Sequence, residues 1–179
     1  MSRRVEVTIT YLEMAERPSF PRPPAPTRPQ IALIKAENPP VRWFLHLYRS
    51  VGAPYDWTDW MTKEQSELDA FVGSPDTAIY TLMVEGWSGG FFMLDGREAG
   101  VTELAYFGLA PEAVGRGLGG FLLKTAVHAA WDWPKTESVT VNTCTLDHPA
   151  ALPLYQKHGF QPVRRHTYTR EIDQGMAAF

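Results

Sequence analysis

Hydrophobic and polar residues follow patterns along the chain that predict an ordered series of strands and helices. Strict alternation over residues 5–12 is typical of a strand with one buried face. Apolar residues at helical spacing predict a helix over residues 41–51, which Gly52 ends. A second helix is predicted to begin at Thr62, whose hydroxyl would cap it in a capping box with Gln65.

The rest of the chain continues this alternation of strands and helices. A long amphipathic helix is predicted over residues 117–131, and a glycine-rich turn over residues 85–90 is expected to join two paired strands. The other predicted strands cover residues 31–35, 77–84, 91–94, 101–109, 138–145 and 160–172, and a short helix covers 149–158. This order predicts an α/β fold built on a mixed sheet.

Four glycines within six positions lie at the start of the long predicted helix. They are Gly115, Gly117, Gly119 and Gly120, and they follow a buried strand. Glycine lets a ligand approach the backbone closely, and the unpaired amides of a helix N-terminus attract anions. Arg116 adds a positive charge. The stretch therefore predicts a cradle for a phosphate or pyrophosphate, with a simple turn between strand and helix as the alternative.

Three kinds of phosphate cradle compete for this stretch. A Walker loop is excluded because no Gly-Lys-Ser/Thr follows. A dinucleotide-binding unit usually places its first glycine directly after the strand, whereas residues 110–114 intervene here. About sixty residues remain after the glycines, too few to complete a six-stranded sheet. A coenzyme A cradle is the third candidate.

Two motifs support the third candidate. The first comprises Leu109, Pro111, Gly115, Arg116, Gly117, Leu118 and Gly119, and the second comprises Ala151, Leu154, Tyr155, Gly159 and Phe160. With them the sequence resembles the GNAT superfamily of N-acetyltransferases over roughly residues 80–172. Val114 departs from the family's Gln/Arg position and His148 from its Asn position. Two motifs in the right order and spacing are more specific than either one alone.

The resemblance implies a GNAT-like fold, with a central, largely antiparallel sheet flanked by helices, in one domain over residues 1–179. It implies acetyl-CoA as co-substrate and direct transfer of the acetyl group to a primary amine of a small acceptor. The pantetheine arm would pair with an open strand edge, and helix amides would hold the pyrophosphate. The cofactor-binding residues implied are Phe107, Leu109, Gly115, Arg116, Gly117, Leu118, Gly119, Gly120 and His148.

Two residues are candidates for proton transfer. Tyr155 occupies the position of the family's tyrosine that protonates the coenzyme A thiolate, and packing of the short helix on the sheet is its alternative role. Glu103 lies where several family members carry a glutamate base. A carboxylate on an apolar strand must find a partner or raise its pKa, which suits a base; an ion pair with Arg or Lys, or deprotonation through water, is the alternative. For His148, a capping role competes with cofactor contact.

The two early helices and their connection are expected to bind the acceptor. Asp56, Trp57, Asp59 and Trp60 combine π faces with carboxylates, a pairing that suits a cationic amine. Packing of these aromatic residues onto the core is the alternative. Cys144 is expected to be a small buried hydrophobe rather than a nucleophile that carries the acyl group.

Composition narrows the class of protein further. A net charge of −3 gives no basic surface for nucleic acid, and no apolar run approaches the length of a membrane span. The single cysteine excludes an internal disulfide, which fits a cytoplasmic location. No ligand spacing predicts a metal site. The proline-rich residues 18–30 are expected to form an arm across the surface, and the resemblance adds a homodimer as an option.

Two other functions compete with an acetyltransferase. The first is a non-catalytic, GNAT-like protein that binds an acyl-CoA as a sensor or structural ligand, which Val114 and His148 leave open. The second is part of a dinucleotide-binding oxidoreductase, which would bind NAD in place of coenzyme A.

Overall fold

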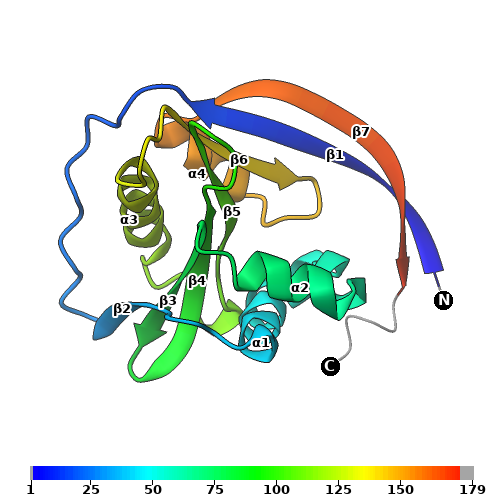
Figure 1. Ribbon diagram of the computed structural model, residues 1–179, viewed down its shortest axis with the longest axis horizontal. Helices are drawn as coiled ribbons and strands as arrows, with labels where there is room; N and C mark the ends of the chain where they lie inside the picture. Colours follow the sequence, from blue (N-terminus) through cyan, green and yellow to red (C-terminus); the bar gives the residue numbers. More distant parts are fainter. Residues whose placement is uncertain (1, 174–179) are drawn as a thin grey trace.

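Within residues 2–173, which the computed structural model describes, seven strands form one sheet in the order β2-β3-β4-β5-β6-β1-β7 (Figure 1). The strands are β1 (Ser2–Met14), β2 (Ile31–Lys35), β3 (Thr77–Val84), β4 (Trp87–Asp95), β5 (Val101–Leu109), β6 (Ser138–Cys144) and β7 (Gln161–Asp173). The helices are α1 (Val41–Gly52), α2 (Gln65–Val72), α3 (Gly119–Trp131) and α4 (Ala151–Lys157). Only β5 and β6 pair in parallel among these strands, so the predicted mixed, largely antiparallel sheet is confirmed.

The sheet carries a hydrophobic core on each face, because successive residues of a strand point to opposite sides. Phe91 and Met93 of β4 join the core formed with α1 and α2, whereas Phe92 and Leu94 join the core formed with α3. Burial on both faces explains why this part of β4 is an unbroken apolar run. Figure 1 shows α3 and the α1–α2 pair on opposite sides of the strands.

The first strand of the chain lies between two of its last strands, a pairing that the sequence pattern does not reveal. Residues 9–14 of β1 pair with β6, while β1 pairs with β7 from Ser2 to Glu13. Where β6 ends, β1 and β7 continue as a two-stranded ribbon that arches past the side of the sheet carrying α2 (Figure 1). The strand predicted over residues 5–12 is therefore longer, since its partner β7 is equally long.

The turn between β3 and β4 is shorter than predicted. Only Glu85 and Gly86 form it, both with positive φ (49° and 93°), as in a two-residue hairpin. The prediction of a turn over residues 85–90 was wrong because Gly90 lies inside the strand. A Cβ at Gly90 would lie 2.6 Å from the carbonyl oxygen of Gly108, so this glycine serves the close approach of β4 to β5.

The start of α2 also differs from the prediction. Thr62 does not cap the helix; it ends a 3₁₀ turn (Asp59–Thr62), and α2 begins at Gln65. Within that turn, the indole of Trp60 stacks on Phe71, with ring centroids 4.4 Å apart. We attribute the 3₁₀ geometry to this tertiary stacking, which outweighs the local capping preference.

The proline-rich arm runs outside α3 between β1 and β2 (Figure 1). Phe20 anchors it, because its ring lies edge-on against His128 and His158 at centroid distances of 5.5 and 5.8 Å. Arg17 adds an ion pair to Asp132 at 3.0 Å. These contacts hold the arm against part of the α3 surface.

Candidate active site

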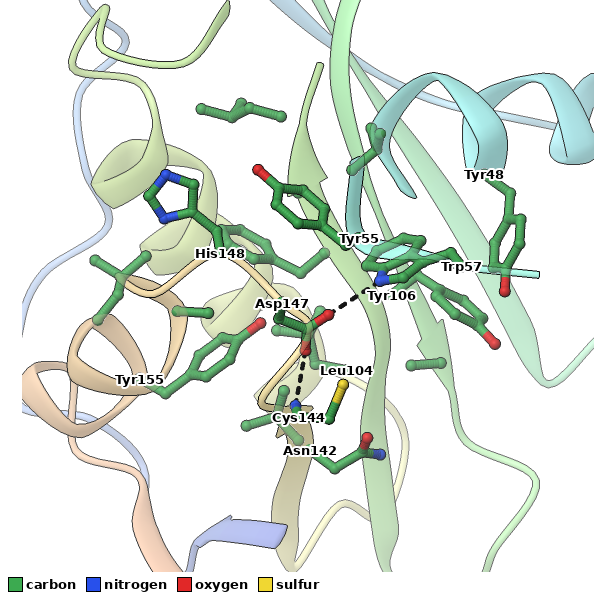
Figure 2. A pocket seen from close by; sticks show the side chains of 18 of the residues that line it. Tyr48, Tyr55, Trp57, Leu104, Tyr106, Asn142, Cys144, Asp147, His148 and Tyr155 are labelled. Atoms are coloured by element: carbon green, nitrogen blue, oxygen red, sulfur yellow. Dashed lines mark hydrogen bonds between the residues drawn. The ribbon is translucent and has the colours of Figure 1, made fainter. Parts of the chain in front are cut away.

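A cavity of about 650 Å³ extends from the glycine run to the loop after α1. Its walls come from β5, β6, the starts of α3 and α4, the residues between α1 and α2, and the β1–β7 ribbon. Figure 2 shows Tyr155, Asp147 and Trp57 around its centre. The cavity thus joins the predicted cofactor cradle to the predicted acceptor region.

The cavity opens where β5 and β6 part. The two strands pair only between residues 101–103 and 138–140. Beyond that point β6 pairs with β1 on its other side, while residues 104–109 of β5 pair only with β4. One edge of β5 near Phe107 and Leu109 is therefore left open, and both residues line the cavity. This is the edge that a pantetheine arm would use.

The glycine run surrounds empty space. Gly115 and Gly117 have φ values of 80° and 76°, a region that side chains disfavour. A Cβ added at Gly115, Gly117, Gly119 or Gly120 would meet nothing within 4 Å, and all four residues line the cavity with Leu118. The helix α3 begins at Gly119 instead of the predicted Gly117, and no side chain caps it. The open backbone and uncapped amides fit a pyrophosphate.

Arg116 does not line the cavity, although the sequence placed it in the cradle. Its guanidinium donates to Glu85 in the β3–β4 turn at 2.9 Å. The cradle is therefore formed by the backbone of the glycine run, without this positive charge.

Tyr155 lies on α4 and is 5% exposed, with its ring against Phe107 and Phe160. It lines the cavity, and its hydroxyl makes no hydrogen bond within residues 2–173. Burial raises its pKa well above the usual value, and the charge of Asp147 raises it further. The phenol is therefore protonated at neutral pH and can donate to a group in the cavity.

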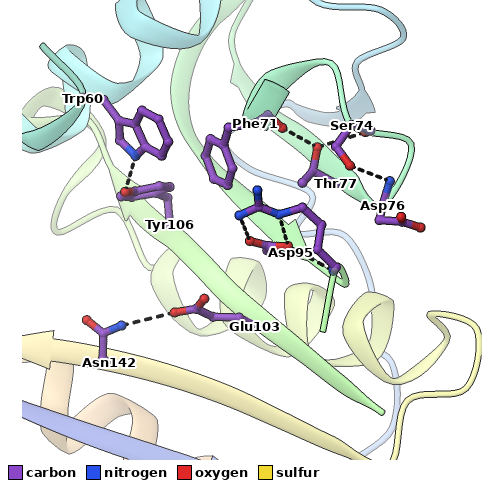
Figure 3. Close-up of polar contacts among 10 residues, drawn as sticks. Trp60, Phe71, Ser74, Asp76, Thr77, Asp95, Glu103, Tyr106 and Asn142 are labelled. Carbon is purple, nitrogen blue, oxygen red and sulfur yellow. Dashed lines mark hydrogen bonds and ion pairs between the residues drawn. The ribbon is translucent and has the colours of Figure 1, made fainter. Parts of the chain in front are cut away.

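Glu103 lies in β5 on the cavity wall, opposite Asp95 in the β4–β5 pairing. Asn142 of β6 donates to its Oε1 at 3.2 Å (Figure 3). Burial raises the pKa of Glu103, the charge of Asp95 raises it further, and the hydrogen bond from Asn142 opposes both. No Arg or Lys forms an ion pair with Glu103 within the described part of the chain, in contrast to the alternative considered from the sequence.

Asp147 connects the two ends of the cavity. Its carboxylate accepts hydrogen bonds from Trp57 Nε1 at 3.0 Å, Thr143 Oγ1 at 2.6 Å and the Cys144 amide at 2.9 Å. Figure 2 shows it between Trp57 and Cys144, on the side to which Tyr155 points. The loop before α4 is thereby fixed to the loop after α1.

Three of the four predicted acceptor-binding residues line the cavity. Trp57, Asp59 and Trp60 line the cavity, but Asp56 does not. Asp56 pairs with Arg3 at 3.6 Å and Asp59 with Arg170 at 3.0 Å, so both carboxylates already have a cationic partner in the β1–β7 ribbon.

His148 and Cys144 also line the cavity. The Nδ1 of His148 accepts from the amide of Ala150 at 3.1 Å, which stabilises the turn before α4. Burial raises the pKa of the Cys144 thiol, and Asp147 adds to this shift. A thiol kept protonated is a poor nucleophile. Cys144 is partly exposed, however, and not the buried hydrophobe that was expected.

Several cavity residues had no signal in the sequence that would have identified them. Tyr48, Tyr106, Asn142 and Arg170 lie on four separate elements, and the aromatic ones have the spacing of ordinary core residues. Asp147 could have been found, because it directly precedes His148, a predicted cofactor-binding residue.

Comparisons with known proteins identify a family and similar folds. The sequence profile of the acetyltransferase (GNAT) family matches residues 42–160. The fold is similar to a GCN5-related N-acetyltransferase from Kribbella flavida (16% identity, TM-score 0.59, 94% of this chain). It is also similar to a GCN5-related N-acetyltransferase from Sphaerobacter thermophilus (18% identity, TM-score 0.60, 95% of this chain). A third similar structure is an aminoglycoside acetyltransferase from an uncultured soil metagenomic sample (14% identity, TM-score 0.56, covering 72% of this chain and 86% of that one).

The fold is that of acetyltransferases of known structure, and the match over residues 42–160 shows that the chain belongs to the GNAT acetyltransferase family. The chain spans 58% of the Kribbella protein and 53% of the Sphaerobacter protein. No curated protein sequence matches it significantly. Along residues 2–173, no helix has the length and apolar character needed to cross a membrane, and no cluster of three metal-ligating residues occurs.

Proposed function

We propose that this protein transfers the acetyl group of acetyl-CoA to a primary amine of a small acceptor. The observation that carries this proposal is a single cavity containing the open glycine cradle, the unpaired edge of β5, Tyr155 and Glu103. Two substrates that meet in one cavity can react directly, because binding holds the reacting atoms in contact.

The residues of the cavity have distinct tasks in this reaction. The backbone of residues 115–120 holds the pyrophosphate, and the open edge of β5 holds the pantetheine arm. Glu103, whose pKa is raised by burial, takes a proton from the amine. The nitrogen lone pair then forms a bond to the thioester carbonyl carbon and the carbon–sulfur bond breaks. The leaving thiolate takes the proton of the Tyr155 hydroxyl, and the acylated nitrogen gives up its second proton, which restores that hydroxyl.

The test measures release of the coenzyme A thiol from acetyl-CoA in the presence of small primary amines. Tyr155→Phe should lower kcat by about 10²- to 10⁴-fold while the Kd of acetyl-CoA stays the same, because only the transferred proton is lost. Tyr80→Phe is the matched control, since Tyr80 stacks on Phe92 outside the cavity and should keep full activity.

A non-catalytic acyl-CoA sensor is the alternative function. It predicts that the wild-type protein binds acetyl-CoA and releases no thiol with any amine. An unchanged kcat in Tyr155→Phe would instead show transfer with a different proton donor.

A further inference from the structure

Aromatic rings form the acceptor half of the cavity. The rings that line it there are Tyr48, Tyr55, Trp57, Trp60, Phe71, Tyr106 and Tyr168. Trp57 lies 5.4 Å from Tyr106 and Trp60 lies 4.4 Å from Phe71, measured between ring centroids. The walls are thus held in place by ring-to-ring packing, which favours a flat, apolar guest.

The two indole N–H groups in these walls already have acceptors. Trp57 donates to Asp147, and Trp60 donates to the hydroxyl of Tyr106 (Figures 2 and 3). A guest therefore does not need to supply hydrogen-bond acceptors to the indoles. The remaining interaction that Trp57 and Trp60 offer is through their ring surfaces.

The charges around the cavity limit the acceptor to a single amino group. Four carboxylates line it, and three of them have partners already: Asp59 has Arg170, Asp95 has Arg97 at 2.7 Å, and Asp147 has three donors. Among these four, only Glu103 has neither an ion pair nor several hydrogen-bond donors: Asn142 donates to it, and the nearby Arg97 is paired with Asp95. A polyamine or an aminosugar with several ammonium groups would need more unpaired carboxylates.

The same pairing excludes an acidic acceptor. The two arginines that line the cavity, Arg97 and Arg170, are both held by aspartates. A carboxylate or phosphate on the acceptor would have to displace Asp95 or Asp59 from them. An acceptor without negative charge avoids this cost.

The size of the cavity fits a small molecule. The volume of about 650 Å³ also has to hold the acetyl group and part of the pantetheine arm. Ile9, Tyr168 and Arg170 of the β1–β7 ribbon also line the cavity.

We infer that the acceptor is an aromatic monoamine with no charged group other than its amino group. Its ring would lie against Trp57, Trp60 and Tyr106, and its amino group would lie at Glu103. This inference rests on the proposed acetyl transfer for its reaction, and on the aromatic walls and the charge pairing for its specificity.

The experiment compares four amines at saturating acetyl-CoA: 2-phenylethylamine, 2-cyclohexylethylamine, spermidine and kanamycin. We expect kcat/KM for 2-phenylethylamine to exceed that for the cyclohexyl compound by about 2- to 12-fold, the range that corresponds to an aromatic pair. It should exceed that for spermidine and kanamycin by about 100-fold or more, because ammonium groups without a partner resist burial.

Two matched variants locate the effect. Trp60→Leu should raise KM for 2-phenylethylamine by about tenfold, within the loss expected for truncating a buried ring, and leave KM for acetyl-CoA unchanged. Trp43→Leu changes a tryptophan of the same core cluster that does not line the cavity, so both constants should stay the same. Equal effects of the two variants would contradict the inference.

A binding measurement separates this inference from the proposed function. Tryptophan fluorescence of the coenzyme A-loaded protein is followed as 2-phenylethylamine is added. Saturable binding without acetylation of any amine would overturn the proposed function and support the aromatic site. Acetylation of spermidine or kanamycin in preference to the aromatic amine, or no binding at millimolar concentration, would overturn the inference.

Discussion

The two halves of the cavity are built from different parts of the polypeptide. The cofactor half consists mainly of backbone from one continuous stretch, residues 104–120, in which glycines leave open space. The acceptor half consists of side chains, among them Tyr48, Trp57 and Arg170, that the fold brings together from distant positions. The first half can change little without losing its ligand, whereas the second can change its guest by substitution of single side chains.

The largest loss of activity should come from substitution of Glu103 in the acceptor half of the cavity. Glu103→Gln keeps the shape of the side chain and removes the base, so kcat should fall by about 10²- to 10⁴-fold. Initial rates at saturating acetyl-CoA measure this, with Glu112→Gln, an exposed residue outside the cavity, as the control. A loss below threefold would mean that water or another group takes the proton.

The same substitution, Glu103→Gln, should increase the stability of the fold at neutral pH although it lowers activity. Because burial raises the pKa of Glu103 above its ordinary value of 4.5, folding favours the protonated form. The stability contributed by this group is fully present below the unfolded-state pKa and is lost as the pH rises through the folded-state pKa. Glu103→Gln should therefore raise Tm at neutral pH, and the gain should vanish at acidic pH. A gain independent of pH would contradict the assigned cause.

The second effect concerns the backbone of the cofactor half. Gly117→Val places a β-branched side chain at a φ of 76° and into the open space of the cradle. We expect the Kd of acetyl-CoA to rise by at least about 30-fold, because the added side chain takes the place of the ligand. Calorimetric titration measures it.

Gly86→Val is the matched control for this glycine. Gly86 also has a positive φ (93°) and open space around it, but it lies in the β3–β4 turn outside the cavity. It should cost similar stability and leave the Kd unchanged. Equal losses of affinity in both variants would show that backbone strain, and not the cradle, is responsible.

The third effect lies at the connection between the halves. In Asp147→Asn an NH₂ group would face at least one of the three donors that now bind the carboxylate. Leaving one buried donor unpaired costs about 1–3 kcal/mol, which lowers Tm by roughly 2–12 °C in a chain of this size. KM for the amine should rise more than KM for acetyl-CoA, because Trp57 loses its anchor. The reverse order would place Asp147 in the cofactor half alone.

The smallest effect is expected for Arg116→Ala. Arg116 pairs with Glu85 and does not line the cavity, so its removal should change the Kd of acetyl-CoA by less than about threefold. Titrations at low and at physiological salt measure this change. A larger loss that salt abolishes would show that Arg116 leaves Glu85 to bind the ligand.

The sequence predicted the local structure of residues 101–131 well because short-range features encode it. A strand, four glycines and a helix follow one another as predicted; the structure differs in starting the helix at Gly119 and in pairing Arg116 with Glu85 outside the cavity. The turn over residues 85–90 and the Thr62 cap were wrong because contacts between distant residues, such as the stacking of Trp60 on Phe71, decide the local geometry. The partner of Asp147 in the acceptor half is 90 residues away in the sequence. No local pattern contains that information.

The most direct measurement is thermal unfolding of the wild-type protein with acetyl-CoA, coenzyme A and NAD in parallel. A ligand of the folded state at one hundred times its Kd stabilises the protein by about 2.7 kcal/mol, which raises Tm by roughly 5–11 °C here. We predict this rise with acetyl-CoA and coenzyme A, and none with NAD. A rise with NAD alone, or no rise with acetyl-CoA at millimolar concentration, would contradict the assignment of the glycine run to coenzyme A.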